Sequence, residues 1–344
     1  MKHFNILQIP GKCHLITRHG IFLSRNEKIF RSCDNGLTWE QIAKVPICLI
    51  DRVKSLCSLS ARMFRSGIYH IYLTNNSNLI VFGFGHIWKF STKNNKWALD
   101  SSPVPISGSR PLYISGNKDL IVYGEYCSNP DRKPIKIWAS KDEGKTWEPV
   151  YSFQKIRHIH GIFWDEYSEN FWITTGDHNK ESGIWRTDHQ FGTVEKVFAG
   201  SQLARTIELI FSDNYIYFGT DTPREQNYIC RIKRSGKDFE RLKKVGSSVF
   251  HACKTANFLF FSTACEPSHT NETRFAVIWG GYPDTDQWID IARYPKDRWP
   301  MKLFQYGQIF FPAGKNDTNF LWYTPFATLN DQITFRMDIS SIFK

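Results

Sequence analysis

Four arginines recur at a nearly constant interval through the middle of the chain. The intervals are 48, 47 and 48 residues, and the arginines are Arg62, Arg110, Arg157 and Arg205. Three positions after each of them stands a second polar side chain: Arg65, Tyr113, His160 or Glu208. Arginine binds a carboxylate through two parallel hydrogen bonds, whereas histidine and glutamate transfer protons. The pattern therefore predicts equivalent positions of a repeated element that converge on an anionic, hydroxyl-rich ligand.

A second set of polar residues follows runs of β-forming residues that stop at glycine. These runs include residues 119–124 and 170–176, and the acids that follow such runs are Glu125, Asp177, Asp221 and Glu266. Further polar residues near the same positions are His158, His251, Glu225 and Asn227. A strand that lines a channel needs only small side chains, so costly polar groups there favour a functional role. Arginines that join neighbouring repeats through ion pairs are the structural alternative.

These two sets give the candidate site. The predicted catalytic residues are His160, Asp177, His251, Asp221 and Glu208. The predicted substrate-binding residues are Arg110, Arg157, Arg205, Tyr113, Glu125, His158, Glu225, Asn227 and Glu266. No cofactor is expected, although His160, Asp177 and His251 could together bind a divalent ion such as manganese, iron or zinc.

The interval of 45 to 50 residues is that of one four-stranded propeller blade. Six outer strands are expected near residues 39–42, 97–99, 147–150, 194–197, 239–242 and 288–291. The tail adds three strand candidates, at residues 308–311, 320–323 and 333–337, but no outer strand follows them. Residues 3–9 have the outer-strand pattern and can complete the last blade. The sequence thus predicts an all-β fold, a seven-bladed β-propeller in one domain of residues 1–344, closed by the N-terminal strand, with six blades as the alternative.

One eight-residue pattern, Ser-x-Asp-x-Gly-x-Thr-Trp, occurs twice, at residues 32–39 and 140–147. It resembles the Asp-box, or bacterial neuraminidase, repeat of the sialidase-like β-propellers. The resemblance implies that each copy forms the turn between the third and fourth strands of a blade. Its aspartate would accept hydrogen bonds from turn amides, its glycine would adopt positive φ and its tryptophan would pack between blades. The functional site would then lie on the opposite face of the propeller.

The resemblance implies less about mechanism. Sialidases bind the substrate carboxylate with three arginines, the first in an Arg-Ile-Pro motif, but this chain has Gln8-Ile9-Pro10. Glutamine lacks the charged fork, so ordinary sialidase activity is not expected. Residues 157–223 also resemble uncharacterised Asp-box proteins linked to bacterial surface-polysaccharide gene clusters. Propeller polysaccharide lyases suggest another scheme, in which Arg157 or Arg205 neutralises a uronic acid and His160 or His251 takes the proton.

Composition narrows the possible classes of protein to which the chain could belong. Twelve tryptophans and 15% aromatic residues suit interlocked sheets, and eight cysteines without a Cys-x-x-Cys pair argue against zinc ribbons. No apolar run is long enough for membrane insertion, and the first ten residues lack the long apolar core of a secretion signal, so we expect a cytoplasmic protein with reduced thiols. The net charge of +11 suits an acidic ligand, but no contiguous basic stripe indicates nucleic acid. We therefore expect a carbohydrate-active enzyme, a glycosidase or lyase for an acidic oligosaccharide or polysaccharide. A non-catalytic glycan-binding, protein-binding or assembly propeller is the alternative, and the oligomeric state stays open.

Overall fold

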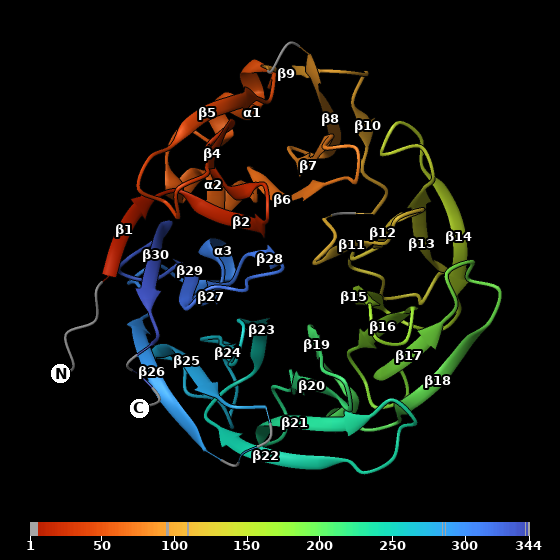
Figure 1. Ribbon diagram of the computed structural model, residues 1–344. Coiled ribbons are helices and arrows are strands. Elements are labelled where there is room, and N and C mark those ends of the chain that lie inside the picture. The colour runs from red at the N-terminus through yellow and green to blue at the C-terminus, as the bar shows by residue number, and fades with distance from the viewer. Residues whose placement is uncertain are drawn as a thin grey trace.

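The computed structural model describes residues 6–93, 96–108, 110–283, 285, 287–340 and 342. Seven antiparallel sheets stand around a central axis like the blades of a propeller (Figure 1). This arrangement confirms the predicted all-β, seven-bladed fold, and the six-bladed alternative is wrong.

In blades one to six, the main strands follow chain order from the axis outward, and blade seven takes its outermost strand from the start of the chain. Blade one contains β2 (Lys12–Thr17), β3 (Gly20–Arg25), β4 (Lys28–Ser32) and β5 (Glu40–Lys44), and β28 (Ala313–Gly314) joins β2 in parallel. Blade two contains β6 (Ile68–Leu73), β7 (Leu79–Gly83) and β8 (His86–Lys93), and β8 pairs with both β9 (Lys96–Leu99) and β10 (Val104–Pro105). Blade three contains β11 (Ile114–Gly116), β12 (Ile121–Gly124), β13 (Ile135–Ser140) and β14 (Glu148–Phe153).

The remaining blades repeat this order. Blade four contains β15 (His158–Asp165), β16 (Asn170–Gly176), β17 (Gly183–Thr187) and β18 (Val194–Ala199). Blade five contains β19 (Leu209–Phe211), β20 (Tyr215–Gly219), β21 (Asn227–Lys233) and β22 (Glu240–Val245). Blade six contains β23 (Val249–Lys254), β24 (Leu259–Thr263), β25 (Phe275–Gly281) and β26 (Trp288–Pro295). Blade seven contains β27 (Gln308–Phe310), β29 (Phe320–Phe326), β30 (Ile333–Asp338) and β1 (Ile6–Pro10).

The ring is closed by strands from the two ends of the chain. Strand β1 pairs antiparallel with β30, in a register that runs from Ile6 opposite Met337 to Pro10 opposite Ile333. The predicted closure by the N-terminal strand is therefore confirmed, while residues 3–5 of the predicted strand lie outside the described residues. Closure matters because an unpaired edge of blade seven would expose a row of backbone hydrogen-bonding groups.

Second strands form the densest part of the core. All five residues of β7 are buried, and Phe171, Trp172 and Ile173 of β16 have no exposed surface. Each second strand is covered on both faces by neighbouring blades, so it reads as a continuous apolar run and not as an alternating one.

Both Asp-box copies form the turn between the third and fourth strands of a blade. Asp34 accepts hydrogen bonds from Thr38 N (2.9 Å), Thr38 Oγ1 (2.6 Å) and Ser32 Oγ (2.8 Å). Gly36 has φ of 83°, and a Cβ there would lie 2.4 Å from Trp322 of the neighbouring blade. Asp142 and Gly144 repeat this geometry in blade three. The predicted scaffold role of the turn is thus visible in its hydrogen bonds and packing.

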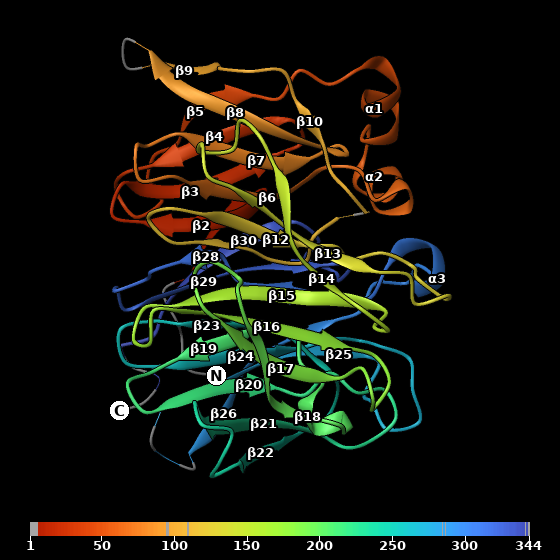
Figure 2. The same cartoon turned by 90° about the vertical axis from the view of Figure 1, so that its right-hand side faces the viewer.

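The two faces of the ring differ. Strand polarity places the Asp-box turns on one face, which we call the Asp-box face, and the starts of the first strands on the other. Helices α1 (Leu49–Lys54), α2 (Ser58–Phe64) and α3 (Met301–Phe304) lie together on this second face, which we call the helix face (Figure 2). The 3-10 helix η1 (Gln202–Ala204) also precedes a first strand. None of the helices in the described residues is long and apolar enough to span a membrane.

The predicted equivalence of the four arginines does not hold for Arg62, which lies in a helix. Residues 62–65 do not begin a strand: Arg62 belongs to α2, Arg65 caps that helix in the left-handed conformation, and β6 starts only at Ile68. Ser60 Oγ accepts a hydrogen bond from Cys57 N and so stabilises the first turn of α2. Arg62 forms ion pairs with Asp297, which follows β26 of blade six, and with Asp331, which lies between β29 and β30 of blade seven.

Candidate functional site

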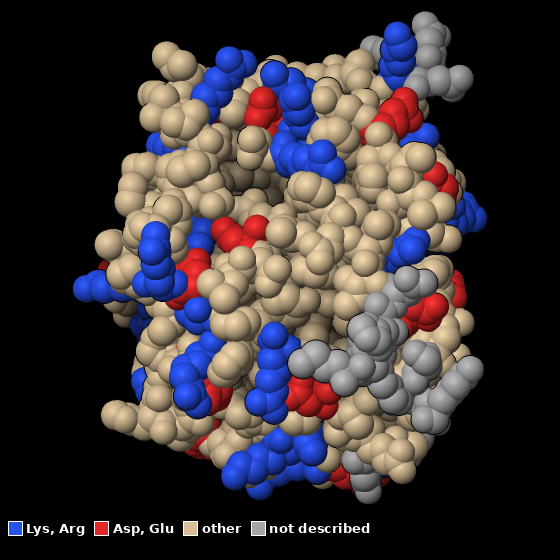
Figure 3. Space-filling model, turned by 90° about the vertical axis from the view of Figure 1, so that its left-hand side faces the viewer, with Lys and Arg blue, Asp and Glu red and all other residues tan. Residues whose placement is uncertain are grey.

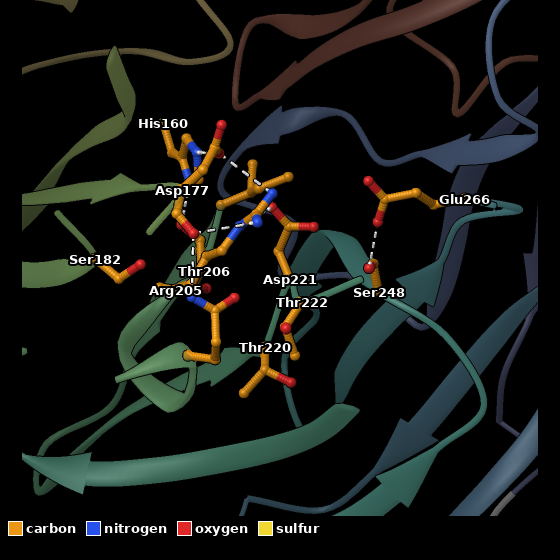
Figure 4. Close-up of polar contacts among 12 residues, drawn as sticks. His160, Asp177, Ser182, Arg205, Thr206, Thr220, Asp221, Thr222, Ser248 and Glu266 are labelled. Atoms are coloured by element: carbon orange, nitrogen blue, oxygen red, sulfur yellow. Dashed lines mark hydrogen bonds and ion pairs between the residues drawn. The ribbon is translucent and has the colours of Figure 1, made fainter. Parts of the chain in front are cut away.

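Blades four and five bring several predicted site residues together on the helix face. His158 and His160 lie at the start of β15, Asp177 directly follows β16, and Arg205 lies between η1 and β19. Gly176 permits this approach, because a Cβ at that position would lie 2.5 Å from His160 Cε1. We call His158, His160, Asp177, Arg157 and Arg205 the histidine cluster. Figure 4 shows Asp177 between His160 and Arg205.

Asp177 is the centre of the histidine cluster. Its Oδ2 accepts a hydrogen bond from Arg157 Nη1 at 2.8 Å, and its Oδ1 lies 3.2 Å from Arg205 Nη2. The same Oδ1 lies 3.3 Å from His158 Nε2 and 3.6 Å from His160 Nε2. Burial disfavours the carboxylate, but the two histidines and Arg205 outweigh burial and hold the pKa of Asp177 well below its usual range. Asp177 therefore stays ionised.

The two histidines have defined tautomers. His158 Nδ1 lies 3.2 Å from the carbonyl oxygen of Cys127, and His160 Nδ1 lies 2.8 Å from that of Thr206. A carbonyl oxygen only accepts, so each Nδ1 carries a proton, and Nε2 of each ring is the atom that faces Asp177. The two Nε2 atoms face each other at 3.2 Å. Burial lowers the pKa of His160, which favours its neutral form.

A pair of acids lies beside the histidine cluster. Asp221 Oδ2 lies 3.2 Å from Arg205 Nε, while Asp221 Oδ1 is buried without a hydrogen-bond partner. Glu266 accepts a hydrogen bond from Ser248 Oγ at 2.6 Å. Burial raises the pKa of both carboxyl groups, and Glu266 and Asp177 raise that of Asp221 further. The pair therefore holds a proton at pH values where an ordinary carboxyl group has lost it.

The opposite side of the helix-face mouth carries cations. Lys12, Arg65 and Arg110 line one pocket of about 100 Å³ together with Tyr69 and Gln305. We call these three cations the cationic wall. Among the described residues, no carboxylate lies within ion-pair distance of them; Arg110 Nη2 donates to Gln305 Oε1 at 3.1 Å. Burial, followed by the charge of Arg110, lowers the pKa of Lys12 to about 7, and burial and Arg65 lower that of Arg110.

Two tyrosines connect the cationic wall to the acids. The pKa of Tyr126 is raised by burial and responds to Asp177 and Asp221 on one side and to Arg110 on the other. The pKa of Tyr306 is likewise raised by burial and responds to Glu266, Arg65 and Asp221. Because charges act strongly only over short distances, both tyrosines lie within electrostatic range of the cationic wall and of the acids.

Sequence reasoning missed four of these residues. Tyr126 follows Glu125 at the end of a second strand, and its position two residues after Gly124 is the only signal for it. Lys12 and Tyr306 fall outside the arginine repeat, and Arg65 was singled out without a site role. Their importance depends on neighbours from other blades, which a single chain position does not reveal.

His251 and Glu208 form a separate pair. His251 Nδ1 lies 2.8 Å from Glu208 Oε1, and His251 Nε2 lies 3.1 Å from Gln308 Oε1. Ala252 N donates to Glu208 Oε2 at 2.6 Å. Among the described residues, His251 does not join the compact set of potential metal ligands, which consists of His158, His160 and Asp177.

Four other predicted residues lie apart from the histidine cluster. Glu125 accepts hydrogen bonds from Ser107, Trp138 and the backbone of Lys136. Asn227 forms hydrogen bonds with Thr220 and Thr222 in the loop before β21 and with Asn271 in the loop between β24 and β25. Tyr113 packs on Phe163 at 4.5 Å between ring centroids, and Glu225 is exposed. Glu125, Asn227 and Tyr113 are thus held by contacts within the scaffold, and the sequence pattern did not predict these structural roles.

A larger pocket lies away from the histidine cluster and the cationic wall. It has a volume of about 530 Å³, opens on the Asp-box face between blades one and seven, and is lined by Arg18, His19, Lys315 and Trp322. Apart from exposed His19 and Asp317, its lining offers no proton-transferring group comparable with the histidine cluster. We therefore place the candidate site on the helix face in spite of the smaller cavity there.

Charge on the outside of the ring is mixed. Figure 3 shows the side of the ring that bears β1, β30 and β26, where basic side chains are scattered among acidic ones. A nucleic-acid-binding protein usually carries a contiguous basic stripe. This side of the molecule therefore gives no support to a nucleic-acid partner.

Comparison with known proteins identifies the fold and one partial sequence relative. No family model matches the chain. A segment of 140 residues is 28% identical to a xyloglucanase of Acetivibrio thermocellus, and it covers 38% of this chain but only 15% of that enzyme's length. The chain thus spans a small part of the curated relative that it matches.

Solved propellers resemble nearly the whole chain. A streptogramin B lyase has a TM-score of 0.62 at 14% identity, covering 97% of this chain and 98% of its own. Virginiamycin B lyase from Staphylococcus aureus has a TM-score of 0.61 at 12% identity, covering 98% and 99%. YCF48 with its bound peptide has a TM-score of 0.60 at 10% identity, covering 98% of each chain. At such identities the likeness shows the β-propeller fold alone, and membership of the sialidase-like family stays a prediction.

Proposed function

We propose that this protein is a carbohydrate-active enzyme that binds an acidic glycan across the helix-face mouth and cleaves it as a glycosidase or a lyase. One observation carries the proposal: proton-transferring side chains and a wall of cations without carboxylate partners lie on the same face of the ring, and the pKa of Tyr126 responds to charges of both groups. The first group suits bond cleavage, and the second suits an anionic substrate.

The cationic wall supports an acidic ligand. Lys12, Arg65 and Arg110 repel one another, and the lowered pKa values of Lys12 and Arg110 reflect this repulsion as well as burial. A carboxylate or sulfate bound among them would relieve the repulsion and accept charge-assisted hydrogen bonds, each worth about 1.5–3 kcal/mol.

The acid pair supports catalysis. Glycoside hydrolysis needs a carboxyl group that still holds its proton near neutral pH. Glu266 is the better proton donor of the pair, because it is half-buried whereas Asp221 is fully buried. A lyase would need a base and a neutraliser for the uronic acid, and the histidine cluster and Arg157 offer these groups. Arg157 is the most exposed member of the cluster, with 39% of its side chain accessible.

Other features support the carbohydrate class of the substrate and the proposed cellular location. The 140-residue similarity to a xyloglucanase favours a carbohydrate substrate, although the matched segment makes up only 15% of that enzyme's length. All eight cysteines are unpaired, which fits our proposal of a reducing, cytoplasmic setting for a single domain. Binding without turnover, as in an assembly propeller, remains the alternative function.

A substrate screen tests the proposal. Wild-type protein and the Glu266→Gln variant are incubated with a panel of uronate-containing and sulfated oligosaccharides. New reducing ends report cleavage, and absorbance of unsaturated products reports elimination. We expect wild type to cleave at least one charged member, and we expect Glu266→Gln to bind it with similar affinity but turn it over at least 100-fold more slowly.

The controls separate the alternatives. Lys141→Gln removes an exposed charge on the Asp-box turn and should leave turnover unchanged. Binding of a charged glycan by wild type without any cleavage would favour the non-catalytic propeller. Failure to bind any charged member would contradict both forms of the proposal.

A further inference from the structure

Three potential metal ligands converge within the histidine cluster. His158 Nε2, His160 Nε2 and an Asp177 carboxylate oxygen all lie within 4.8 Å of one another. We propose that these three atoms bind one divalent first-row transition-metal ion on one face of its coordination sphere. Metal binding at this site is separate from glycan binding by the cationic wall, and the ligand set differs from the one expected from the sequence by containing His158 in place of His251.

Hydrogen bonding leaves one nitrogen of each ring available as a metal ligand. The carbonyl oxygens of Cys127 and Thr206 accept from Nδ1 of His158 and His160. The two Nε2 atoms face each other and the carboxylate of Asp177. A metal ion between these three atoms would accept a lone pair from each of them at once.

The spacing suits a metal ion. A metal bound at ~2.1 Å from two imidazole nitrogens in octahedral or tetrahedral geometry places those nitrogens roughly 3.0–3.4 Å apart. The observed separations are 3.2 Å between the nitrogens and 3.3 and 3.6 Å from each nitrogen to Asp177 Oδ1. Two histidines and one carboxylate on one face leave the remaining positions open, a ligand set that suits iron, manganese, cobalt or zinc.

The outer contacts also match those of metal sites. Metal-binding histidines usually donate their second ring nitrogen to a backbone carbonyl or a carboxylate, as His158 and His160 do. The ligating carboxylate is usually hydrogen-bonded as well, and Arg157 holds Asp177 Oδ2 at 2.8 Å. Two guanidinium groups nearby are opposed by the carboxyl groups of Asp177, Asp221 and Glu266, so the local charge does not exclude a cation.

A proton shared between the two imidazoles is the competing explanation. It would satisfy the Nε2 pair but would leave Asp177 Oδ1 dependent on Arg205. The two explanations predict different results in a metal titration, because a shared proton without a metal site gives no metal binding at any concentration.

Metal titration without glycan tests the proposal. Protein stripped with a chelator is titrated with Co²⁺, followed by visible absorption, and with Zn²⁺, followed by calorimetry. We expect one ion per chain and a higher melting temperature of the wild type in Zn²⁺. His158→Ala and His160→Ala should each weaken binding by more than about 100-fold, since loss of an outer-shell contact alone costs 10–100-fold. His251→Ala, the matched control, should bind like wild type.

Anomalous diffraction from metal-soaked crystals of the wild type tests the site even if the histidine variants fail to fold. A peak between His158, His160 and Asp177 is expected. Absence of binding by wild type, a peak elsewhere, or unchanged affinity in folded His158→Ala and His160→Ala would overturn the proposal. None of these outcomes bears on glycan binding by the cationic wall, so the two proposals fail separately.

Discussion

The histidine cluster and the cationic wall share one mouth but balance charge in opposite ways. In the cluster, Arg157 and Arg205 both bind Asp177, and Arg205 also binds Asp221. In the cationic wall, Lys12, Arg65 and Arg110 have no carboxylate at ion-pair distance among the described residues. Both groups are charged, yet only the cluster compensates its charge within the protein.

This difference separates structural charge from charge available to a ligand. A compensated cluster is held in one geometry and becomes unstable when one member is removed. An uncompensated wall is under repulsion, so removal of one of its charges relieves strain while weakening binding of an anion. Stability and affinity should therefore respond in opposite ways on the two sides.

Asp177→Ala should cause the largest effect. Its loss leaves the largely buried Arg205, with 10% of its side chain exposed, facing two histidines without its central partner. We expect a decrease of about 3–5 kcal/mol in the free energy of unfolding. Arg110→Ala should change it by less than about 1 kcal/mol. Denaturant unfolding of both variants measures the contrast, and equal destabilisation would show that the two sides do not differ.

Asp221→Asn should remove part of the pH dependence of stability. The pKa of Asp221 is raised on folding by burial, so the folded state binds more protons than the unfolded state above about pH 4. The stabilisation is therefore fully present below that pH and is lost as the pH rises toward the folded-state value, at no more than about 1.4 kcal/mol per pH unit. In thermal unfolding from about pH 5 to 8, the melting temperature of the variant should rise relative to that of wild type as the pH increases. A constant difference across this range would contradict the assigned shift.

Lys12 should take up a proton when an anion binds. Its pKa of about 7, lowered by burial and then by Arg110, leaves it mostly neutral at about pH 8. An anion on the cationic wall favours the charged form, so calorimetry in two buffers of different ionisation enthalpy should detect uptake of up to about one proton. Lys12→Met should abolish the uptake, whereas Lys302→Met, an exposed control on α3, should not. Equal uptake in both variants would assign the proton to another group.

The fold was predictable because its signals are local and repeated. The Asp boxes, the glycine-terminated second strands and the closing pattern before Gly11 each depend on a few adjacent residues. The arginine repeat was only partly informative, because Arg157 and Arg205 reach the histidine cluster while Arg62 lies in a short helix. Equal spacing along the chain does not show whether a helix precedes a strand.

The site was harder to predict because partners come from different blades. His251 lies on a first strand as His160 does, yet it contacts Glu208 and not Asp177. Glu125 follows its second strand as Asp177 does, yet it is bound by Trp138 within its own blade. Lys12 belongs to no repeat, and burial followed by the charge of Arg110, from a distant part of the chain, makes it unusual. Such contacts depend on distances that sequence periodicity does not encode.

The most direct test compares a uronate oligosaccharide with its carboxyl-reduced, neutral analogue. Affinities of wild type and of the Arg65→Gln, Arg110→Gln double variant are measured by calorimetry at low and high salt. We predict that wild type prefers the charged ligand by about 100-fold at low salt, and that salt or the double substitution removes most of this preference. Equal affinity of wild type for both ligands, or an unchanged preference in the folded double variant, would contradict a cationic wall that binds the acid group of a glycan.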